Sequence, residues 1–191
     1  MFGFVGLLYL VELADAEVFG GRLDGGGIRP REVSGLDGVL FAPLLHGGWA
    51  HLSANTLPVL LFGFLAMAAG LHQWVAVTAT IWLVSGFGVW LAAAPGSVTV
   101  GASGLVFGWL TFLLARGWFN RSALQILLAV VLLFFWGGLL LGVLPSRPDI
   151  SWQGHLFGAL AGVLAAWLAA KANGPAYRPQ SRPPPRPRSA P

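Results

Sequence analysis

The sequence contains no cysteine and few charged residues. The absence of cysteine from all 191 residues excludes a disulfide framework, a thiolate metal site and a cysteine nucleophile. Charged residues make up 9% of the chain and hydrophobic residues 56%, and the mean hydropathy of +0.74 is far from that of ordinary soluble proteins. This composition predicts an integral membrane protein.

Acidic residues are scarce, and none lies within residues 49–144. A membrane aspartyl protease needs two carboxylates that share a proton within its spans. A helical zinc protease needs the pattern H-E-x-x-H, and no glutamate accompanies a histidine in that way here. Both classes are therefore excluded, and the sequence predicts neither a metal nor a cofactor.

Long apolar runs predict an all-α protein with six transmembrane helices, because about 20 apolar residues are needed for one helical crossing. The runs cover residues 1–18, 49–70, 73–93, 101–117, 122–144 and 152–170. The first run has the apolar core of a signal peptide, but no Lys or Arg precedes it, so we interpret it as a short first span. Glu12 interrupts it, and we expect the span to end there with the carboxylate among the lipid headgroups.

The distribution of cations predicts the orientation of the spans. Seven of the 11 Lys and Arg residues lie at the end of the fourth span or after the fourth or sixth span, and four lie on the opposite side. Since positive residues are retained in the cytoplasm, we expect both termini to be cytoplasmic. The compact six-span plan without an organellar transit peptide indicates a bacterial plasma membrane. Residues 1–171 then form the membrane domain, and 172–191 a disordered tail rich in Pro and Arg. We expect this basic tail to interact with anionic lipid and not with nucleic acid.

Polar residues gather at the starts of the even-numbered spans. His46, His51 and Asn55 lie near the start of the second span, Ser103 at the start of the fourth and His155 at the start of the sixth. These starts share one depth near the outer face if the six spans are correct. Polar groups within a membrane are costly and usually functional, so the pattern predicts a single site.

Glycines recur at four-residue spacing around Ser103 and His155. Gly104 and Gly108 follow the serine, and Gly154 and Gly158 bracket the histidine. Small residues at this spacing let membrane helices approach closely, so we expect the fourth and sixth spans to bring Ser103 and His155 within hydrogen-bond distance. A neutral imidazole there can activate the serine hydroxyl, and the lack of a nearby carboxylate indicates a dyad.

An acyl-transfer site also needs donors for the oxyanion of its tetrahedral intermediate. His51 and Asn55 are four residues apart and therefore share one helix face. Together with the backbone amide of Ser103, they could supply these donors. His46 need not share that face, and we expect it to tie down the preceding loop.

The three polar segments together resemble the rhomboid family. The resemblance covers about residues 20–171 and rests on three motifs in the family's order. They are His46-Gly47-Gly48-Trp49-Ala50-His51-Leu52-Ser53-Ala54-Asn55, Gly101-Ala102-Ser103-Gly104 and Gly154-His155-Leu156-Phe157-Gly158. A Trp-Arg pair that such proteins often carry in the outer loop is missing between Phe19 and Leu45.

The resemblance implies an intramembrane serine endopeptidase that cuts single-span membrane proteins. Ser103 would be the nucleophile, His155 the general base and acid, and His51 and Asn55 the oxyanion stabilisers. His46, Gly101, Gly104 and Gly158 would be structural residues near the site. The fifth span and the loop at 144–151 would move aside for the substrate.

Two other functions are compatible with parts of the pattern. A non-catalytic relative that binds membrane clients would be expected to lack Ser103, His155 or both. A transporter with a histidine proton relay would be expected to place carboxylates in its later spans. The sequence specifies neither a substrate sequence nor an oligomeric state.

Overall fold

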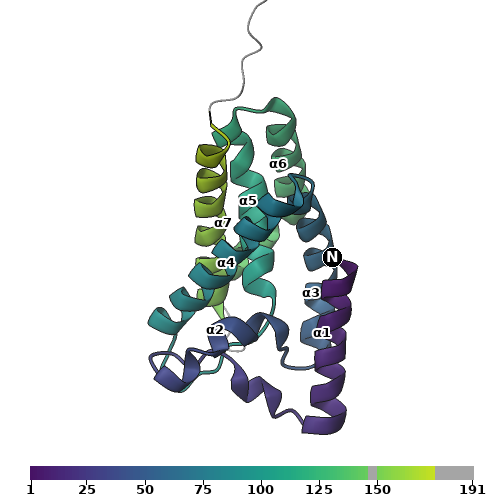
Figure 1. The fold of residues 1–191 in the computed structure, drawn as a ribbon, viewed down its shortest axis with the longest axis vertical. Coiled ribbons are helices and arrows are strands. Elements are labelled where there is room, and N and C mark those ends of the chain that lie inside the picture. Colours follow the sequence, from purple (N-terminus) through teal and green to yellow (C-terminus); the bar gives the residue numbers. More distant parts are fainter. Residues whose placement is uncertain (146–149, 175–191) are drawn as a thin grey trace, which may run out of the picture.

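The six predicted spans are all helical in the computed structural model, which describes residues 1–145 and 150–174. The described residues contain no β-strand, only an isolated antiparallel bridge between Ile28 and Thr99. Figure 1 shows the helices as one bundle, with short helices and loops wrapped around its lower end. The predicted all-α membrane fold is confirmed.

The spans follow the order of the sequence. They are α1 (Phe2–Ala14) continued by the π-helix η1 (Asp15–Phe19), α3 (Trp49–Met67), α4 (Leu71–Ala92), α5 (Ser103–Asn120), α6 (Ala123–Trp136) continued by the 3-10 helix η5 (Gly137–Val143), and α7 (Trp152–Ala172). The segment between η1 and α3 holds the 3-10 helices η2 (Leu23–Gly26), η3 (Val33–Gly35) and η4 (Ala42–Leu44), and the short helix α2 (Gly38–Phe41). We call the end of the bundle with this segment the site end, and the opposite end the far end.

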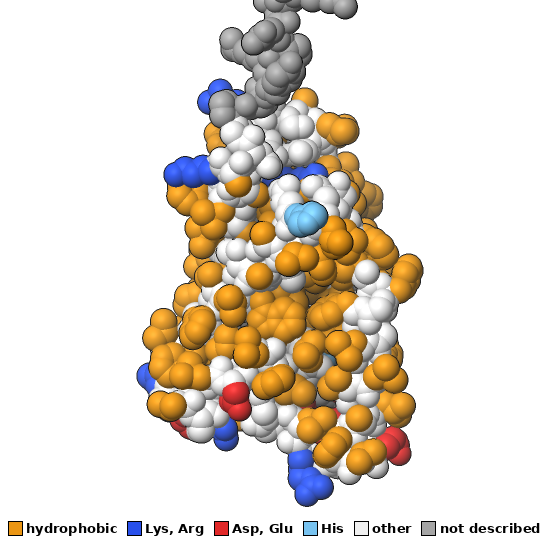
Figure 2. Space-filling view, viewed as in Figure 1, with side chains coloured by type: hydrophobic (Ala, Val, Ile, Leu, Met, Phe, Trp, Pro, Cys, Tyr) orange, Lys and Arg blue, Asp and Glu red, His pale blue; other side chains and the backbone are white. Residues whose placement is uncertain are grey.

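Four of these helices are each long and apolar enough to cross a membrane, namely α3, α4, α6 with η5, and α7. Helix α5 differs because it lies at the centre of the bundle and its residues 105–113 are all buried. A helix surrounded by other helices does not need an apolar lipid-facing surface. Figure 2 shows a broad hydrophobic belt over the middle of the molecule, with charged side chains towards its two ends.

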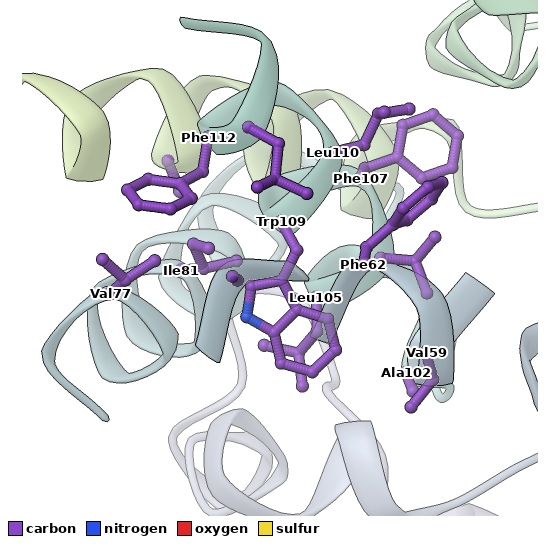
Figure 3. Close-up of a cluster of buried hydrophobic side chains, with 14 of the residues drawn as sticks. Val59, Phe62, Val77, Ile81, Ala102, Leu105, Phe107, Trp109, Leu110 and Phe112 are labelled. Carbon is purple, nitrogen blue, oxygen red and sulfur yellow. The ribbon is translucent and has the colours of Figure 1, made fainter. Parts of the chain in front are cut away.

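The core surrounds α5 and includes buried side chains of α3, α4 and α7. Figure 3 shows Trp109 and Phe112 of α5 packed among side chains of the neighbouring helices, with Phe112 beside Val77 and Ile81. Phe62, Trp109 and Phe112 have no exposed surface. These contacts fix α5, whose first residue is Ser103, against its neighbours.

Helix α1 corrects the expectation for Glu12. The helix continues past this residue to Ala14, and the Glu12 side chain is only 5% exposed. The carboxylate therefore faces the protein. The next carboxylate, Asp15, is also buried, and its Oδ1 accepts a hydrogen bond from the backbone N–H of Leu23 at 2.9 Å.

The segment between η1 and α3, which we call the outer segment, packs on α4 without the missing Trp-Arg pair. Trp90 and Trp82, both from α4, donate their indole N–H groups to the carbonyls of Glu32 and Val39, each at 2.9 Å. Arg31 donates its backbone N–H to the Trp90 carbonyl at 3.0 Å. Trp90 of α4 and Arg31 of the outer segment therefore anchor this segment to the bundle, although no Trp-Arg pair lies within the segment itself.

Candidate active site

The predicted nucleophile, Ser103, is the first residue of α5. The chain enters this helix through Gly101, whose φ of +116° is a conformation that side chains other than glycine rarely adopt. The Gly101 backbone N–H donates to the Ala42 carbonyl at 2.8 Å, which fixes the turn. The first backbone N–H groups of a helix have no partner within it, so those at the start of α5 are free to bind an anion.

Ser103 and His155 meet at the site end of α5 and α7. The Ser103 Oγ lies 3.0 Å from the His155 Nε2. The two helices approach this closely because a Cβ on Gly158 would overlap the Gly104 carbonyl, and a Cβ on Gly162 would overlap the Gly108 carbonyl. The close packing of these helices that the glycine spacing predicted is therefore present.

His155 is oriented by two further groups. Its Nδ1 lies 2.9 Å from the Gly142 carbonyl oxygen, which can only accept, so Nδ1 carries the proton. Nε2 is then unprotonated and presents its lone pair to the Ser103 hydroxyl. The Phe107 ring stacks on the imidazole, with centroids 4.1 Å apart and planes 7° apart. A carbonyl thus occupies the position that an aspartate has in a catalytic triad.

His51 lies against the turn that precedes Ser103. A Cβ on Gly101 would come within 2.8 Å of His51 Nε2, so the ring occupies the space that any side chain there would need. His51 Nδ1 accepts a long hydrogen bond of 3.4 Å from the Gly47 N–H, which leaves the proton on Nε2. This N–H group therefore lies beside Gly101, two residues before Ser103.

Asn55 is one turn after His51 on the same helix face, as the spacing predicted. Its side chain is 6% exposed, and its Nδ2 donates to the His51 carbonyl at 3.0 Å. An amide nitrogen has two hydrogens, so a second donor remains for another acceptor.

His46 contacts the same turn from the outer segment. The ring is buried, and its Nε2 accepts a hydrogen bond of 3.4 Å from the Ala102 N–H. Its centroid is 5.2 Å from that of His51, in an edge-to-face arrangement. Burial, helped by the neighbouring His51, lowers the pKa of His46 to about 4. His46 is therefore neutral at physiological pH.

The outer segment holds the turn before Ser103 at several points. Ile28 and Thr99 exchange two backbone hydrogen bonds of 2.9 and 3.0 Å. With the bonds from Gly101 to Ala42 and from Ala102 to His46, they connect residues 99–102 to residues 28–46. The serine therefore sits on a turn whose backbone is fixed from outside the helix.

A small cavity of about 30 Å³ lies beside Ser103. Its lining includes the hydroxyl-bearing residues Ser85, Thr99 and Ser151. A cavity needs roughly 10–15 Å³ to hold one water, so this one is large enough and polar enough for water. Within residues 1–145 and 150–174, no three His, Cys, Asp or Glu side chains are grouped so that they could hold a metal ion.

The structure thus brings all five predicted polar residues to one end of the bundle. Two contacts of His155 were not predicted, those with Gly142 and Phe107. Gly142 lies in an apolar run with Gly137 and Gly138, and no feature of the sequence distinguishes it from them. Phe107 is four residues after Ser103 and therefore shares its helix face, which was the one available signal.

Comparison with known proteins gives a family match over most of the chain. Residues 34–172 match the Rhomboid domain. Uncharacterized proteins of Mycobacterium tuberculosis and Mycobacterium bovis are each 53% identical over 166 residues, covering 83% of this chain and 69% of the relative. An uncharacterized protein of Mycobacterium leprae is 47% identical over 166 residues, covering 83% of this chain and 65% of the relative. No solved structure matches. On the strength of the domain match, this chain belongs to the rhomboid family.

Proposed function

We propose that the chain is an intramembrane serine endopeptidase that cuts transmembrane helices of other proteins near the outer face of the membrane. The observation that carries this proposal is the 3.0 Å contact between Ser103 Oγ and His155 Nε2, with the opposite ring nitrogen bonded to a carbonyl. That arrangement supports an unprotonated Nε2 next to a hydroxyl, which is what general-base activation of serine requires.

The first chemical step forms an acyl-enzyme. Ser103 Oγ attacks the scissile carbonyl carbon while its proton moves to His155 Nε2. The resulting imidazolium keeps its Nδ1–H bond to the Gly142 carbonyl, whose dipole stabilises the positive charge. His155 then gives the Nε2 proton to the leaving amine as the peptide C–N bond breaks.

The oxyanion of the tetrahedral intermediate needs donors within hydrogen-bond distance. The Ser103 backbone N–H at the start of α5 is one, and the helix dipole adds favourable positive potential there. His51 Nε2–H and the second Asn55 N–H are the two candidate side-chain donors. We assign them this role because His51 lies against Gly101, two residues before Ser103, and Asn55 shares the His51 helix face one turn later.

The second step hydrolyses the acyl-enzyme. Water gives a proton to His155 Nε2 as its oxygen attacks the ester carbonyl carbon. The C–O bond to Ser103 then breaks, and His155 returns the proton to Ser103 Oγ as the new carboxyl group leaves. The cavity beside Ser103 offers a place for this water within the protein. Its hydroxyl-bearing lining can hold water in an otherwise apolar bundle.

The fifth span is the natural path for a substrate helix. Only 6% of the span Ala123–Val143 is buried, whereas the other three membrane-spanning segments are 28–39% buried. Little packing would be lost if α6 moved away from α3 and α5. Its 3-10 continuation η5 carries Gly142, so such a movement would also reach the group that orients His155.

Fluorophosphonate labelling tests the proposal. These probes react with activated serines, so the purified full chain should label, while Ser103→Ala and His155→Ala should not. Thermal melting of the three proteins checks that each is folded. A folded native chain that does not label would favour the alternative, a rhomboid relative that binds membrane clients without cutting them.

A further inference from the structure

Arg116 lies on α5 near the far end, well away from Ser103. Its guanidinium Nε and Nη1 are buried and have no hydrogen-bond partner among the described residues. The Phe112 ring lies under the guanidinium, with its centroid 5.8 Å from the guanidinium carbon. The side chain as a whole is partly buried, and buried N–H groups without an acceptor are costly, so the arrangement favours an anion from outside the chain.

The helix register places Arg116 level with the start of α4. Helices α4 and α5 run antiparallel, with Gly104 against Ser85 and Gly108 against Ile81. Trp109 continues this register through its hydrogen bond of 3.1 Å to Thr78. Two turns further along α5, Arg116 therefore reaches the level of His72 and Gln73.

A groove opens at this level. Helix α4 crosses the bundle diagonally, so it diverges from α5 and α7 towards the far end (Figure 1). The groove between α4 and α7 has a volume of about 630 Å³, within the size range of ligand sites. The residues that line it include the apolar Val77, Ala165 and Leu168 and the polar His72, Gln73 and Asn173. Val77 also packs beside Phe112, the ring under Arg116 (Figure 3).

Charge at the far end favours an anion. The acidic side chains that the structure describes all lie in residues 12–37, in α1 or the outer segment at the site end. The far end carries Arg116, Arg121 and Lys171, and the sequence after Lys171 contains no Asp or Glu. The side chains of the chain therefore offer Arg116 no carboxylate at this end.

We propose that this groove binds an anionic phospholipid. The phosphate accepts hydrogen bonds from the Arg116 guanidinium, and an acyl chain lies along Val77 and Leu168. Arg116 is four residues before the end of α5, about 6 Å along the helix axis, which is headgroup depth for a membrane-spanning helix. A planar guanidinium binds phosphate through two parallel N–H groups, which makes arginine well suited to this site.

Native mass spectrometry of the full chain in an uncharged detergent tests this site with phosphatidylglycerol as the probe. We expect Arg116→Gln to reduce retained lipid about tenfold, as the loss of a charged hydrogen-bonding group predicts. Arg121→Gln removes a charge from an exposed residue at the same end and should retain lipid like the native chain. Equal retention by Arg116→Gln and the native chain would overturn the proposal.

A second pair of variants tests the groove and leaves Arg116 intact. Ala76 is exposed on α4 and lines the groove, so Ala76→Trp should block the acyl chain and lower retention. Ala79→Trp makes the same change on the same helix outside this groove and should have no effect. Equal retention by both variants would refute the acyl site, even if Arg116→Gln did not fold.

Two further probes identify the source of the phosphate. Inorganic phosphate should raise the melting temperature less than phosphatidylglycerol does, and phosphatidylcholine should be retained less. An equal effect of inorganic phosphate would show that the site takes a free anion. Equal retention of phosphatidylcholine would contradict the preference for an anionic lipid.

Discussion

The imidazole of His155 is held on two sides, by the Gly142 carbonyl and by the Phe107 ring. Neither contact depends on a charged group. Orientation therefore comes from packing and one neutral hydrogen bond, which suits a site where a buried carboxylate would be costly. The sequence predicted the pairing of Ser103 with His155 because glycine spacing and polar residues mark it. It could not predict Gly142, because a backbone carbonyl leaves no signature in the side-chain pattern.

Gly142→Ala should slow fluorophosphonate labelling of Ser103 by about 10–100-fold, because small displacements of catalytic groups are expensive. A Cβ at this position would lie 3.1 Å from His155 Nδ1 and 2.9 Å from the Phe107 ring. Gly138→Ala is the matched control, since no atom lies within 4 Å of its Cβ. The measurement is the labelling rate of folded Gly142→Ala compared with that of folded Gly138→Ala. Equal rates would show that η5 does not position His155.

His46 should make stability depend on pH. Its pKa of about 4 in the folded protein lies below its ordinary value of 6.5, so the unfolded chain binds a proton more readily. The His46 contribution to stability is complete above pH 6.5 and is lost as pH falls towards 4. His46→Gln keeps an acceptor for the Ala102 N–H but cannot titrate in this range.

Melting temperatures of the native chain and of His46→Gln between pH 7 and 4 check this expectation. The other three histidines are the same in both proteins. The native chain should lose stability more steeply than His46→Gln. Parallel curves would mean that His46 is not held neutral by burial.

At the scale of elements, α5 and α7 form the tightest contact, and glycines determine it. Beyond the glycines, Thr111 Oγ1 donates to the Ala159 carbonyl at 2.8 Å, and Ser85 Oγ donates to the Gly154 carbonyl at 3.2 Å. The glycine spacing was enough to predict that these helices pack closely. The Ser85 contact brings α4 into the same packing. It could not be predicted, because Ser85 stands alone in an apolar run.

Gly158→Ala should destabilise the protein by about 1–3 kcal/mol, the usual cost of overpacking. The new methyl group would collide with the Gly104 backbone and push α7 away from α5. Gly6→Ala in α1 is the control, because nothing lies within 4 Å of its Cβ. Thermal melting in detergent measures both, and an unchanged melting temperature for Gly158→Ala would show that the two helices are not packed this tightly.

The outer segment shows where prediction from the sequence stops. Its length and composition indicated a loop outside the membrane, but its anchoring depends on residues far away in the chain. Trp90 and Arg31 are separated by 59 positions and meet only because α4 returns to the site end. Glu12 is similar, since its burial follows from the neighbours of α1 and not from the local sequence.

At the scale of the whole molecule, the chain has a polar, mixed-charge site end and a cationic far end, separated by the hydrophobic belt of Figure 2. We propose that the far end faces the cytoplasm, because positive residues concentrate there. The sequence after residue 174 lies outside the described residues, so its predicted role as a disordered cytoplasmic tail remains a prediction.

The native absence of cysteine makes this orientation directly testable. Ser34 of the outer segment and Asn173 at the end of α7 are both exposed. In intact bacteria, Ser34→Cys should react with a membrane-impermeant maleimide, while Asn173→Cys should react only after the cells are opened. The reverse pattern would place the site end in the cytoplasm.

Cleavage of a membrane-embedded substrate is the measurement that tests the central claim most directly. The purified chain is placed in liposomes together with a single-span test protein. The span of this protein has a helix-destabilised segment and a small residue near the outer face, the features that the resemblance to rhomboid proteases implies for a substrate. We predict cleavage within or beside the span by the native chain, and none by Ser103→Ala or His155→Ala. Cleavage that persists in Ser103→Ala, or a folded native chain that cuts no such substrate, would contradict the account.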